Sequence, residues 1–349
     1  MKFVIWDPGQ TKSSELQSEC NEAAWLQKGR SLKEKEARLH QLISKLSSMY
    51  PQHTEFLKYL HRSDGDESVP TIYVITPTYW RPVQEAELTR LSHTFQLVPK
   101  LHWIVIEDSN TTTKLVGDLL RRSLLTYTRL HVATPQAYKL PANPKLSWVH
   151  PRGVLQRNLG LQWLRTNLDA EKQKGVVYFA DDDNTYDQAL FEEMRSTKTV
   201  SVWPVGLVGG LLVEGPLVEG GKVVSWNSVW KRHRPFPIDM AGFAINLRLL
   251  LNHPNVAFKL KAEIGYQESL LLKEIVTISE LEPRADNCSK VLVWHTRTEA
   301  PKLDQENNGS YIFQPNLPCF KKWSVREGVE VGIVQINSVT VSFVFLPVL

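Results

Sequence analysis

The sequence predicts an α/β protein built on a mostly parallel sheet of the nucleotide-binding type. Between residues 70 and 195, short apolar runs alternate with segments of helical spacing, as in sheets whose successive strands are joined by helices. The run 175–180, Gly-Val-Val-Tyr-Phe-Ala, is apolar on both faces and ends in three aspartates. Such a run is typical of a buried central strand, and ligands bind at the carboxyl ends of such strands.

The first half of the globular region begins at Pro70. We expect strands over residues 71–76, 102–107, 130–133 and 175–180, because these runs are short and rich in β-branched and aromatic residues. We expect helices over residues 84–95, 114–125, 153–168 and 187–195, where apolar residues recur at helical spacing. Strands and helices therefore alternate through this half.

After residue 195 the pattern changes to shorter strands. We expect these over residues 200–205, 208–213, 222–226, 240–246 and 291–294, with helices near 247–251 and 268–275. Glycine pairs such as Gly220-Gly221 mark tight turns. This half is therefore expected to be mixed or antiparallel.

Two flanking regions differ from the globular part. Residues 1–69 are polar, with helical spacing over 22–60 and a linker at 63–68, which is typical of a stem helix. Residues 307–349 end in an apolar, β-prone stretch, which is either an alternative end of the chain or an extension that forms edge strands. The predicted organisation is therefore 1–69 stem, 70–195 nucleotide-binding half, 196–306 second half and 307–349 atypical tail.

Composition excludes several classes of protein. The formal net charge of +4 is too small to indicate a nucleic-acid partner. Three cysteines make no disulfide scaffold, and their odd number leaves one unpaired or pairing between chains. No apolar run is long enough for a transmembrane helix and no signal peptide is evident, so we expect a soluble chain or one without its anchor. N-glycosylation sequons occur at Asn110, Asn287 and Asn308.

The acidic triplet Asp181, Asp182 and Asp183 is the strongest chemical signal. Adjacent carboxylates repel one another unless a cation neutralises them, and carboxylate oxygens suit Mg²⁺ or Mn²⁺. Such ions commonly carry substrate phosphates, so the triplet predicts a divalent metal that holds a phosphorylated ligand. The alternative is a solvated turn in which Asp183 or Asn184 caps the following helix.

A set of ordered motifs resembles the animal β-1,3-glucuronosyltransferases, glycosyltransferase family 43. The motifs are Pro77-Thr-Tyr-Trp-Arg81, Glu107-Asp108, His150-Pro-Arg-Gly-Val-Leu-Gln-Arg-Asn158, Asp181-Asp-Asp-Asn-Thr-Tyr186, Asp239-Met-Ala-Gly-Phe-Ala244, Gly265-Tyr-Gln-Glu-Ser269 and Val293-Trp-His-Thr-Arg-Thr-Glu299. The resemblance covers residues 70–299. It extends to both the HNK-1-type branch and the proteoglycan-linkage branch, and Gly-Tyr-Gln-Glu-Ser is closer to the former.

This resemblance implies a GT-A-type nucleotide-sugar transferase fold, with a mixed central sheet flanked by helices and an N-terminal stem helix. It also implies an inverting transfer of glucuronic acid. The donor would be UDP-glucuronate, the cofactor Mn²⁺, and the acceptor O3 of a terminal β-galactose on a glycoprotein or proteoglycan glycan. Family members resemble homodimers and lie on the lumenal side of the Golgi membrane through an N-terminal anchor that this chain does not show. Past residue 307 the resemblance ends.

The resemblance also assigns donor-site residues. Asp183 would bind Mn²⁺, while Asp181 and Asp182 would hold an arginine and the ribose hydroxyls. Tyr79 would stack on uracil and Asp108 would accept from its ring N–H; the alternatives are a core aromatic and a strand-end turn former. The remaining donor residues would be Arg152, Arg157, His295 and Arg297. For Arg157 the alternative is a surface salt bridge, and for His295 a structural role.

On the acceptor side, Glu268 matches the family's catalytic base. A carboxylate is needed there to take the hydroxyl proton as that oxygen attacks C1 of the sugar. Without the resemblance, Glu268 is a first-turn helix residue favoured by the helix dipole. The acceptor galactose would contact Glu214, Trp230, Arg234 and Asp239. The residues 211–213 before Glu214 depart from the family pattern, which leaves acceptor specificity open.

Two other functions remain open at this stage. A related transferase could use another UDP-sugar, such as UDP-xylose, although His295 and Arg297 favour an acidic donor. A non-catalytic galactoside-binding protein is the second, although it would need neither a metal motif nor a base.

Overall fold

The computed structural model describes residues 69–139 and 151–299 throughout, together with scattered positions between 38 and 49, residue 301, and the backbone of 331–336 and 339–344. The described positions between 38 and 49 are helical and exposed. The rest of the predicted stem helix lies outside the described residues. In the tail, β13 (Val331–Ile336) and β14 (Val339–Val344) form an antiparallel hairpin.

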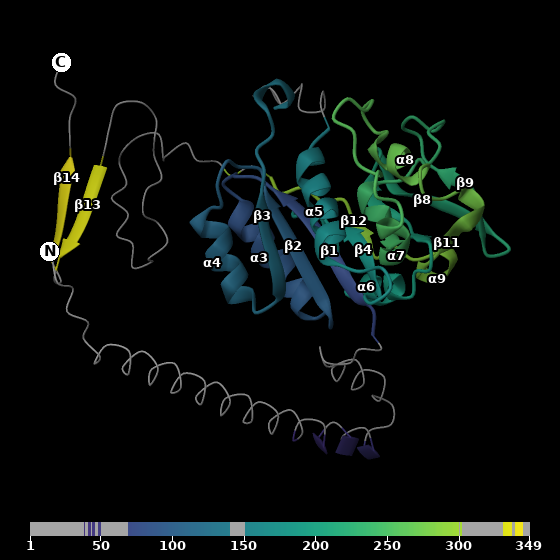
Figure 1. Ribbon diagram of the computed structural model, residues 1–349, viewed down its shortest axis with the longest axis horizontal. Helices are drawn as coiled ribbons and strands as arrows, with labels where there is room; N and C mark the ends of the chain where they lie inside the picture. The colour runs from purple at the N-terminus through teal and green to yellow at the C-terminus, as the bar shows by residue number, and fades with distance from the viewer. Residues whose placement is uncertain are drawn as a thin grey trace, which may run out of the picture.

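A mixed seven-stranded sheet forms the centre of the molecule (Figure 1). Its parallel part comprises β1 (Thr71–Thr78), β2 (Leu101–Glu107), β3 (Thr126–His131) and β4 (Gly175–Phe179). Beyond β4 lie the antiparallel β10 (Phe243–Asn246), then β6 (Val200–Val202) and β11 (Leu281–Pro283). The order is β11-β6-β10-β4-β1-β2-β3, so the two halves of the globular chain share one sheet.

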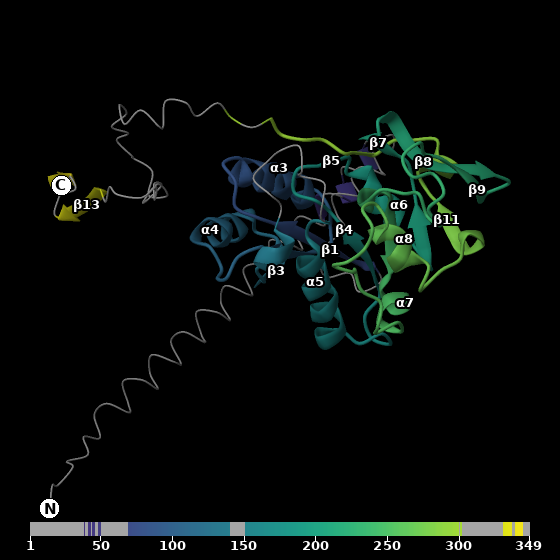
Figure 2. The same cartoon turned by 90° about the horizontal axis from the view of Figure 1, so that it is seen from above.

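Helices cover both faces of this sheet (Figure 2). One face packs against α3 (Gln84–Gln96), α4 (Lys114–Ser123) and α6 (Ala189–Arg195). The other packs against α5 (Val154–Asn167), α7 (Leu247–Leu251) and α8 (Gln267–Leu272). Because β1, β2 and β4 are buried on both faces, most of their side chains are apolar, and each large apolar one contributes about 1.5–3 kcal/mol on burial. The predicted α/β class with a mixed central sheet flanked by helices is confirmed.

A second, five-stranded sheet has the order β5-β12-β7-β8-β9. Its strands are β5 (Thr185–Tyr186), β12 (Val293–Trp294), β7 (Val205–Val208), β8 (Leu211–Glu219) and β9 (Lys222–Asn227). The shorter elements are the 3₁₀ helices η2 (Gln136–Tyr138), η4 (Met240–Gly242) and η5 (Ile278–Glu280), and the turn α9 (Ala285–Cys288), whose four residues all have positive φ. Because β5 directly follows the acidic triplet and pairs with β12, this sheet joins that triplet to the segment that begins at His295.

Several predicted boundaries were wrong. The strand expected at 130–133 lies at 126–131, where it pairs in register with β2. The strand expected at 208–213 is interrupted by Gly209 and Gly210, whose φ values of +63° and +81° form the turn between β7 and β8. Residues 240–242 are 3₁₀-helical rather than extended, because the Asp239 side chain caps them. The helix expected at 268–275 ends at Leu272.

The parallel strands end at one edge, and the functional residues gather there. Thr78 pairs with Glu107, so Tyr79 and Asp108 follow at adjacent strand ends. Ala180 donates its N–H to the carbonyl of Ile75 at 3.1 Å, so the acidic triplet emerges beside the end of β1.

Candidate active site

Two of the three aspartates after β4 are paired with arginines. Asp181 forms an ion pair with Arg157. Asp182 Oδ1 lies 2.6 Å from Arg81 Nη2, and its Oδ2 accepts from Thr78 Oγ1 at 2.6 Å. The N-cap of α6 is Gln188, so the alternative in which Asp183 or Asn184 caps this helix was wrong.

Asp183 differs from its two neighbours. Among the described residues nothing donates to its carboxylate, although its backbone carbonyl accepts from Arg90 and from Thr296. Burial, followed by the negative charges of Asp181 and Asp182, raises the pKa of Asp183 to about 6. A divalent cation would relieve this repulsion.

The acidic strand end, which is Asp181–Asp183 directly after β4, fits a metal ion that is held mainly by oxygens of a bound phosphorylated ligand. In the described part of the chain no three His, Cys, Asp or Glu side chains are placed to bind one ion. A site with one free carboxylate, at Asp183, suits an ion such as Mg²⁺ or Mn²⁺ that takes its other ligands from phosphates and water.

Tyr79 and Asp108 lie side by side at the ends of β1 and β2. The Asp108 N–H donates to the carbonyl of Thr78 at 2.7 Å, which holds the two strand ends together. Tyr79 is 46% exposed, so it is not a core aromatic and its ring is available for stacking. The Asp108 carboxylate accepts from the N–H and the hydroxyl of Thr134, both at 2.7 Å, which orients it.

Arg157 is not a surface residue. It lies in the first turn of α5 and is only 7% exposed. It pairs with Asp181 and donates to the carbonyl of Arg152 at 2.8 Å, while the Arg152 side chain is exposed. Gly153, with φ +67°, allows this turn, because a Cβ there would lie 2.7 Å from Arg157 Nη1.

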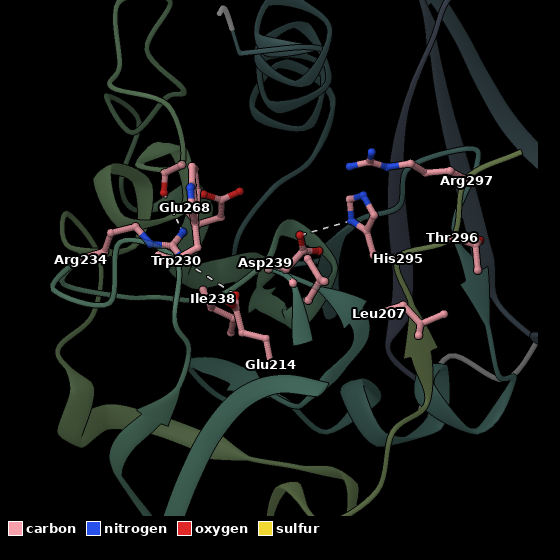
Figure 3. Close-up of a pocket in the computed structure, with 14 residues that line it drawn as sticks. Leu207, Glu214, Trp230, Arg234, Ile238, Asp239, Glu268, His295, Thr296 and Arg297 are labelled. Carbon is pink, nitrogen blue, oxygen red and sulfur yellow. Dashed lines mark hydrogen bonds and ion pairs between the residues drawn. The ribbon is translucent and has the colours of Figure 1, made fainter. Parts of the chain in front are cut away.

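Figure 3 shows a cleft of about 840 Å³. It lies next to Asp183, because Thr296 in its lining donates to the carbonyl of Asp183. Its lining residues are Leu207, Val208, Gly209, Gly210, Glu214, Trp230, Arg234, Ile238, Asp239, Gly265, Glu268, His295, Thr296 and Arg297. Figure 3 shows Glu214, Trp230, Arg234 and Glu268 on one side, His295 and Arg297 on the other, and Asp239 between them.

One wall of the cleft combines an aromatic face with a buried ion pair. Arg234 Nη2 lies 3.7 Å from Glu214 Oε1, and both side chains are 4% exposed. The Arg234 guanidinium also lies 5.3 Å from the centre of the Trp230 ring. Gly265, with φ +81°, packs under that ring, where a Cβ would lie 2.0 Å from Trp230 Cζ3. Carboxylate, guanidinium and an exposed indole together suit the hydroxyls and the apolar face of a sugar.

Glu268 lies in the first turn of α8 and faces this wall. Its Oε2 is buried and has no hydrogen-bond partner among the described residues. Burial raises the pKa of Glu268 to about 7, and the charge of Asp239 adds to the effect while its own N–H and two arginines oppose it. A carboxylate with one unpartnered oxygen and a pKa near neutrality, in a cleft, has the properties of a general base.

His295 and Asp239 form an ion pair across the cleft. His295 Nδ1 lies 3.4 Å from Asp239 Oδ2, and this contact raises the pKa of His295 against the effect of burial. Arg297, two residues on, is exposed and has no ion-pair partner in the described ranges 69–139 and 151–299. This side of the cleft therefore carries positive charge.

Thr296 connects the cleft to the acidic strand end. Its hydroxyl donates to the carbonyl of Asp183 at 2.6 Å and lies 3.1 Å from the hydroxyl of Thr185. The cleft thus gathers the predicted acceptor residues, Glu268, His295 and Arg297, whereas Asp181–Asp183, Tyr79, Asp108, Arg152 and Arg157 lie outside its lining. The cleft and the strand end are two adjoining parts of one site.

Sequence reasoning missed several residues of this site. Leu207, Ile238, Gly265 and Thr296 line the cleft. The only sequence signals were the position of Thr296 between His295 and Arg297 and that of Gly265 at the start of the Gly-Tyr-Gln-Glu-Ser motif.

The remaining predictions concern the surface. Asn110 and Asn287 are exposed, and Asn308 lies outside the described residues. Cys288 is a free thiol whose pKa burial raises to about 11, and Cys20 and Cys319 lie outside the described residues. In the part of the chain that the structure describes, no helix has the length and apolar character needed to span a membrane.

The chain is similar in sequence to several known proteins. Residues 91–299 match the model of glycosyltransferase family 43. The chain is 55% identical over 261 residues to human galactosylgalactosylxylosylprotein 3-beta-glucuronosyltransferase 1, covering 74% of this chain and 78% of that protein. It is 52% identical over 284 residues to human galactosylgalactosylxylosylprotein 3-beta-glucuronosyltransferase 3, covering 79% of this chain and 82% of that protein. A solved structure of S. aureus TarS 1-349 with UDP-GlcNAc is a distant likeness, with a TM-score of 0.43 at 16% identity over 69% of this chain and 62% of that one.

Proposed function

The chain belongs to glycosyltransferase family 43, and on that basis we propose that it transfers glucuronic acid from UDP-glucuronate to O3 of a terminal β-galactose. The acceptor would be a glycan of a glycoprotein or proteoglycan. The single observation that supports this most is the unpaired, buried Oε2 of Glu268 facing a sugar-sized cleft. A galactoside-binding protein without catalysis would have no use for such a group.

In the proposed reaction, Glu268 takes the proton of the galactose O3 hydroxyl. That oxygen forms a bond to C1 of the glucuronate, on the face opposite UDP, while the bond between C1 and the phosphate oxygen breaks. The configuration at C1 is therefore inverted. Glu268 needs to be ionised before the attack, and its pKa of about 7 leaves a substantial ionised fraction at neutral pH.

The acceptor galactose would lie between Trp230 and Glu268. The indole would pack on the apolar face of the ring, and Glu214 and Arg234 would bind hydroxyl groups. Asp239 would contribute a further carboxylate while holding His295. These contacts would place O3 within reach of Glu268.

The donor would bind along the acidic strand end. Tyr79 and Asp108 would hold the uracil, and Arg152 and Arg157 would lie near the donor, with Asp181 and Asp182 contributing to ribose binding. His295 and Arg297 would bind the diphosphate and the glucuronate carboxylate, because both offer positive charge on the far side of the cleft. An acidic donor fits these residues better than a neutral UDP-sugar.

Mn²⁺ is the proposed cofactor, and Asp183 is the residue that would hold it. When bound, the ion would neutralise the charge that develops on the UDP leaving group. The free carboxylate of Asp183 and its raised pKa support this assignment. A homodimer on the lumenal side of the Golgi membrane is proposed from the family alone.

The test is transfer of glucuronate to two acceptors, N-acetyllactosamine and galactosyl-β-1,3-galactose, with Mn²⁺ and again with EDTA. We expect transfer that EDTA abolishes. Preference for N-acetyllactosamine would place the chain in the HNK-1-type branch, and preference for the digalactose in the proteoglycan-linkage branch. The absence of transfer to both, from folded protein that binds UDP, would contradict the proposal.

A further inference from the structure

Arg81 is a nearly buried arginine that the proposed reaction does not use. It follows β1 and its side chain is 13% exposed. Its Nη2 contacts two carboxylates, Glu87 of α3 and Asp182 of the acidic strand end. Both partners are buried, with 3% and 8% of their side chains exposed, so Arg81 is the cation that allows two negative charges to lie there.

The same guanidinium also holds Tyr79. Arg81 Nη1 donates to the Tyr79 carbonyl at 3.1 Å, and its Cζ lies 4.6 Å from the centre of the Tyr79 ring. Arg81 therefore contacts both the residue predicted to stack on the base and the residue that precedes the predicted metal ligand. These two residues are 103 positions apart in sequence, and a rigid planar cation joins them.

Asp182 is fixed from both of its oxygens. Oδ1 binds Arg81, and Oδ2 accepts from Thr78 Oγ1 at 2.6 Å. Thr78 Oγ1 in turn accepts from Gln84 Nε2 at 3.0 Å, and both of these side chains are buried. With Asp182 held in this way, the next residue, Asp183, is left as the unpaired carboxylate of the triplet.

We propose that Arg81 is the positioning residue of the donor site, which sets the direction of Asp183 through Asp182 and the orientation of the Tyr79 ring. This inference rests on the proposed Mn²⁺ and UDP site. Arg81 does not contact the reacting atoms. Its contribution is to hold the base-binding and metal-binding residues in one fixed arrangement before the donor arrives.

The test compares Arg81→Lys with Arg195→Lys. Lysine keeps the charge and loses the planar set of donors. Arg195 is a matched control: it is 7% exposed, pairs with Glu192 of α6, and donates to the carbonyls of Pro70 and Pro99, which precede β1 and β2. Each substitution removes a guanidinium that pairs with a carboxylate, but only Arg81 contacts Asp182.

The main readout is Mn²⁺ binding, measured by loss of the free-ion electron paramagnetic resonance signal, with and without UDP. For Arg81→Lys we expect affinity for Mn²⁺ in the presence of UDP to fall about tenfold or more, with an unchanged KM for the galactoside. Arg195→Lys should lower the thermal midpoint and leave Mn²⁺ affinity unchanged. Equal Mn²⁺ affinity in the two variants would overturn the inference.

A second pair of variants covers the case in which Arg81→Lys does not fold. Thr78→Val removes the hydroxyl that donates to Asp182, and we expect about fivefold weaker Mn²⁺ binding. Thr76→Val is its control on the same strand, because among the described residues the Thr76 hydroxyl forms a hydrogen bond with Trp103 Nε1 alone, at 2.9 Å, and does not contact Asp182. Unchanged Mn²⁺ binding in Thr78→Val would count against a role for the fixed Asp182.

The wild-type protein separates this inference from the proposed function. Wild-type protein that binds no Mn²⁺ with UDP would contradict the proposed function itself. If the wild-type protein binds Mn²⁺ and UDP, and the Arg81→Lys variant binds them with the same affinity, the positioning role alone is contradicted.

Discussion

Asp239 Oδ2 lies 3.4 Å from His295 Nδ1. This carboxylate therefore lies between the side of the cleft that carries Glu268 and the side that carries Arg297. The other oxygen of Asp239 accepts from the Ala241 N–H at 2.9 Å, which fixes the carboxylate at the start of η4. Although burial opposes ionisation, the His295 contact and this N–H hold the pKa of Asp239 below its usual value. The ion pair therefore keeps His295 protonated at a higher pH than an isolated histidine.

Asp239→Asn should move the alkaline limit of activity to a lower pH. Without the carboxylate, the pKa of His295 falls, and its positive charge is lost at a lower pH. We expect kcat/KM to drop at least about tenfold at pH 8 and less at pH 6. The measurement is the pH profile of both proteins, with Asp169→Asn, an exposed position, as the control. An alkaline limb that does not move would contradict the role assigned to this pair.

Glu268→Gln should abolish the base without disturbing donor binding. We expect kcat to fall by roughly 10²–10⁴, with UDP affinity unchanged by calorimetry. In the wild-type protein, kcat/KM should decline as the pH falls through about 7, because Glu268 becomes protonated there. Glu274→Gln, on the loop after α8, is the control. Turnover at the normal rate in folded Glu268→Gln would exclude this residue as the base.

The same substitution should stabilise the fold at alkaline pH. Because the folded-state pKa of Glu268 is raised to about 7 from 4.5, the folded protein binds more protons than the unfolded chain between these values, and stability falls as the pH rises. Glu268→Gln removes this penalty, so at pH 8 its free energy of unfolding should exceed that of the wild type by up to ~3 kcal/mol. At pH 4 the two should be equal. Urea unfolding at both pH values measures this difference. Equal stability of the two proteins at pH 8 would show that the folded-state pKa of Glu268 is not raised.

Gly265→Ala should weaken acceptor binding through Trp230. The new Cβ would lie 2.0 Å from the indole, so the ring has to move. We expect the KM for the galactoside to rise about tenfold, with unchanged UDP affinity. Gly220→Ala is the control, because φ is also positive there, at +56°, but nothing lies within 4 Å of the new Cβ. If both variants raise KM equally, backbone strain rather than Trp230 is responsible.

The central strands and their helices could be predicted because their signals are local. The strand around Val177 is apolar on both faces, and α5 has a clear helical spacing, so burial and periodicity suffice. The strands β5 and β11 could not be found, because each has only two or three residues and exists through pairing with a distant partner. The turn between β7 and β8 was hidden in an apolar run whose glycines interrupt it.

In the candidate site too, residues with local sequence signals could be predicted and contacts between distant segments could not. The motifs supplied Glu268, Asp183 and His295, because these residue types stand in recognisable strings. The hydrogen bond from Thr296 to the Asp183 carbonyl joins residues 113 positions apart and leaves no pattern in either segment. The burial of Arg157 against Asp181 also depends on packing, which is why a surface ion pair was a reasonable alternative.

The position of β10 has a consequence for how the molecule unfolds. This strand, from the second half of the chain, lies between β4 and β6 and pairs with both. The boundary proposed near residue 195 therefore falls inside one hydrogen-bonded sheet, and residues 70–195 expressed alone would expose the edge of β4. The two halves should therefore melt together in a single cooperative transition, and they should not open and close about a hinge near residue 195.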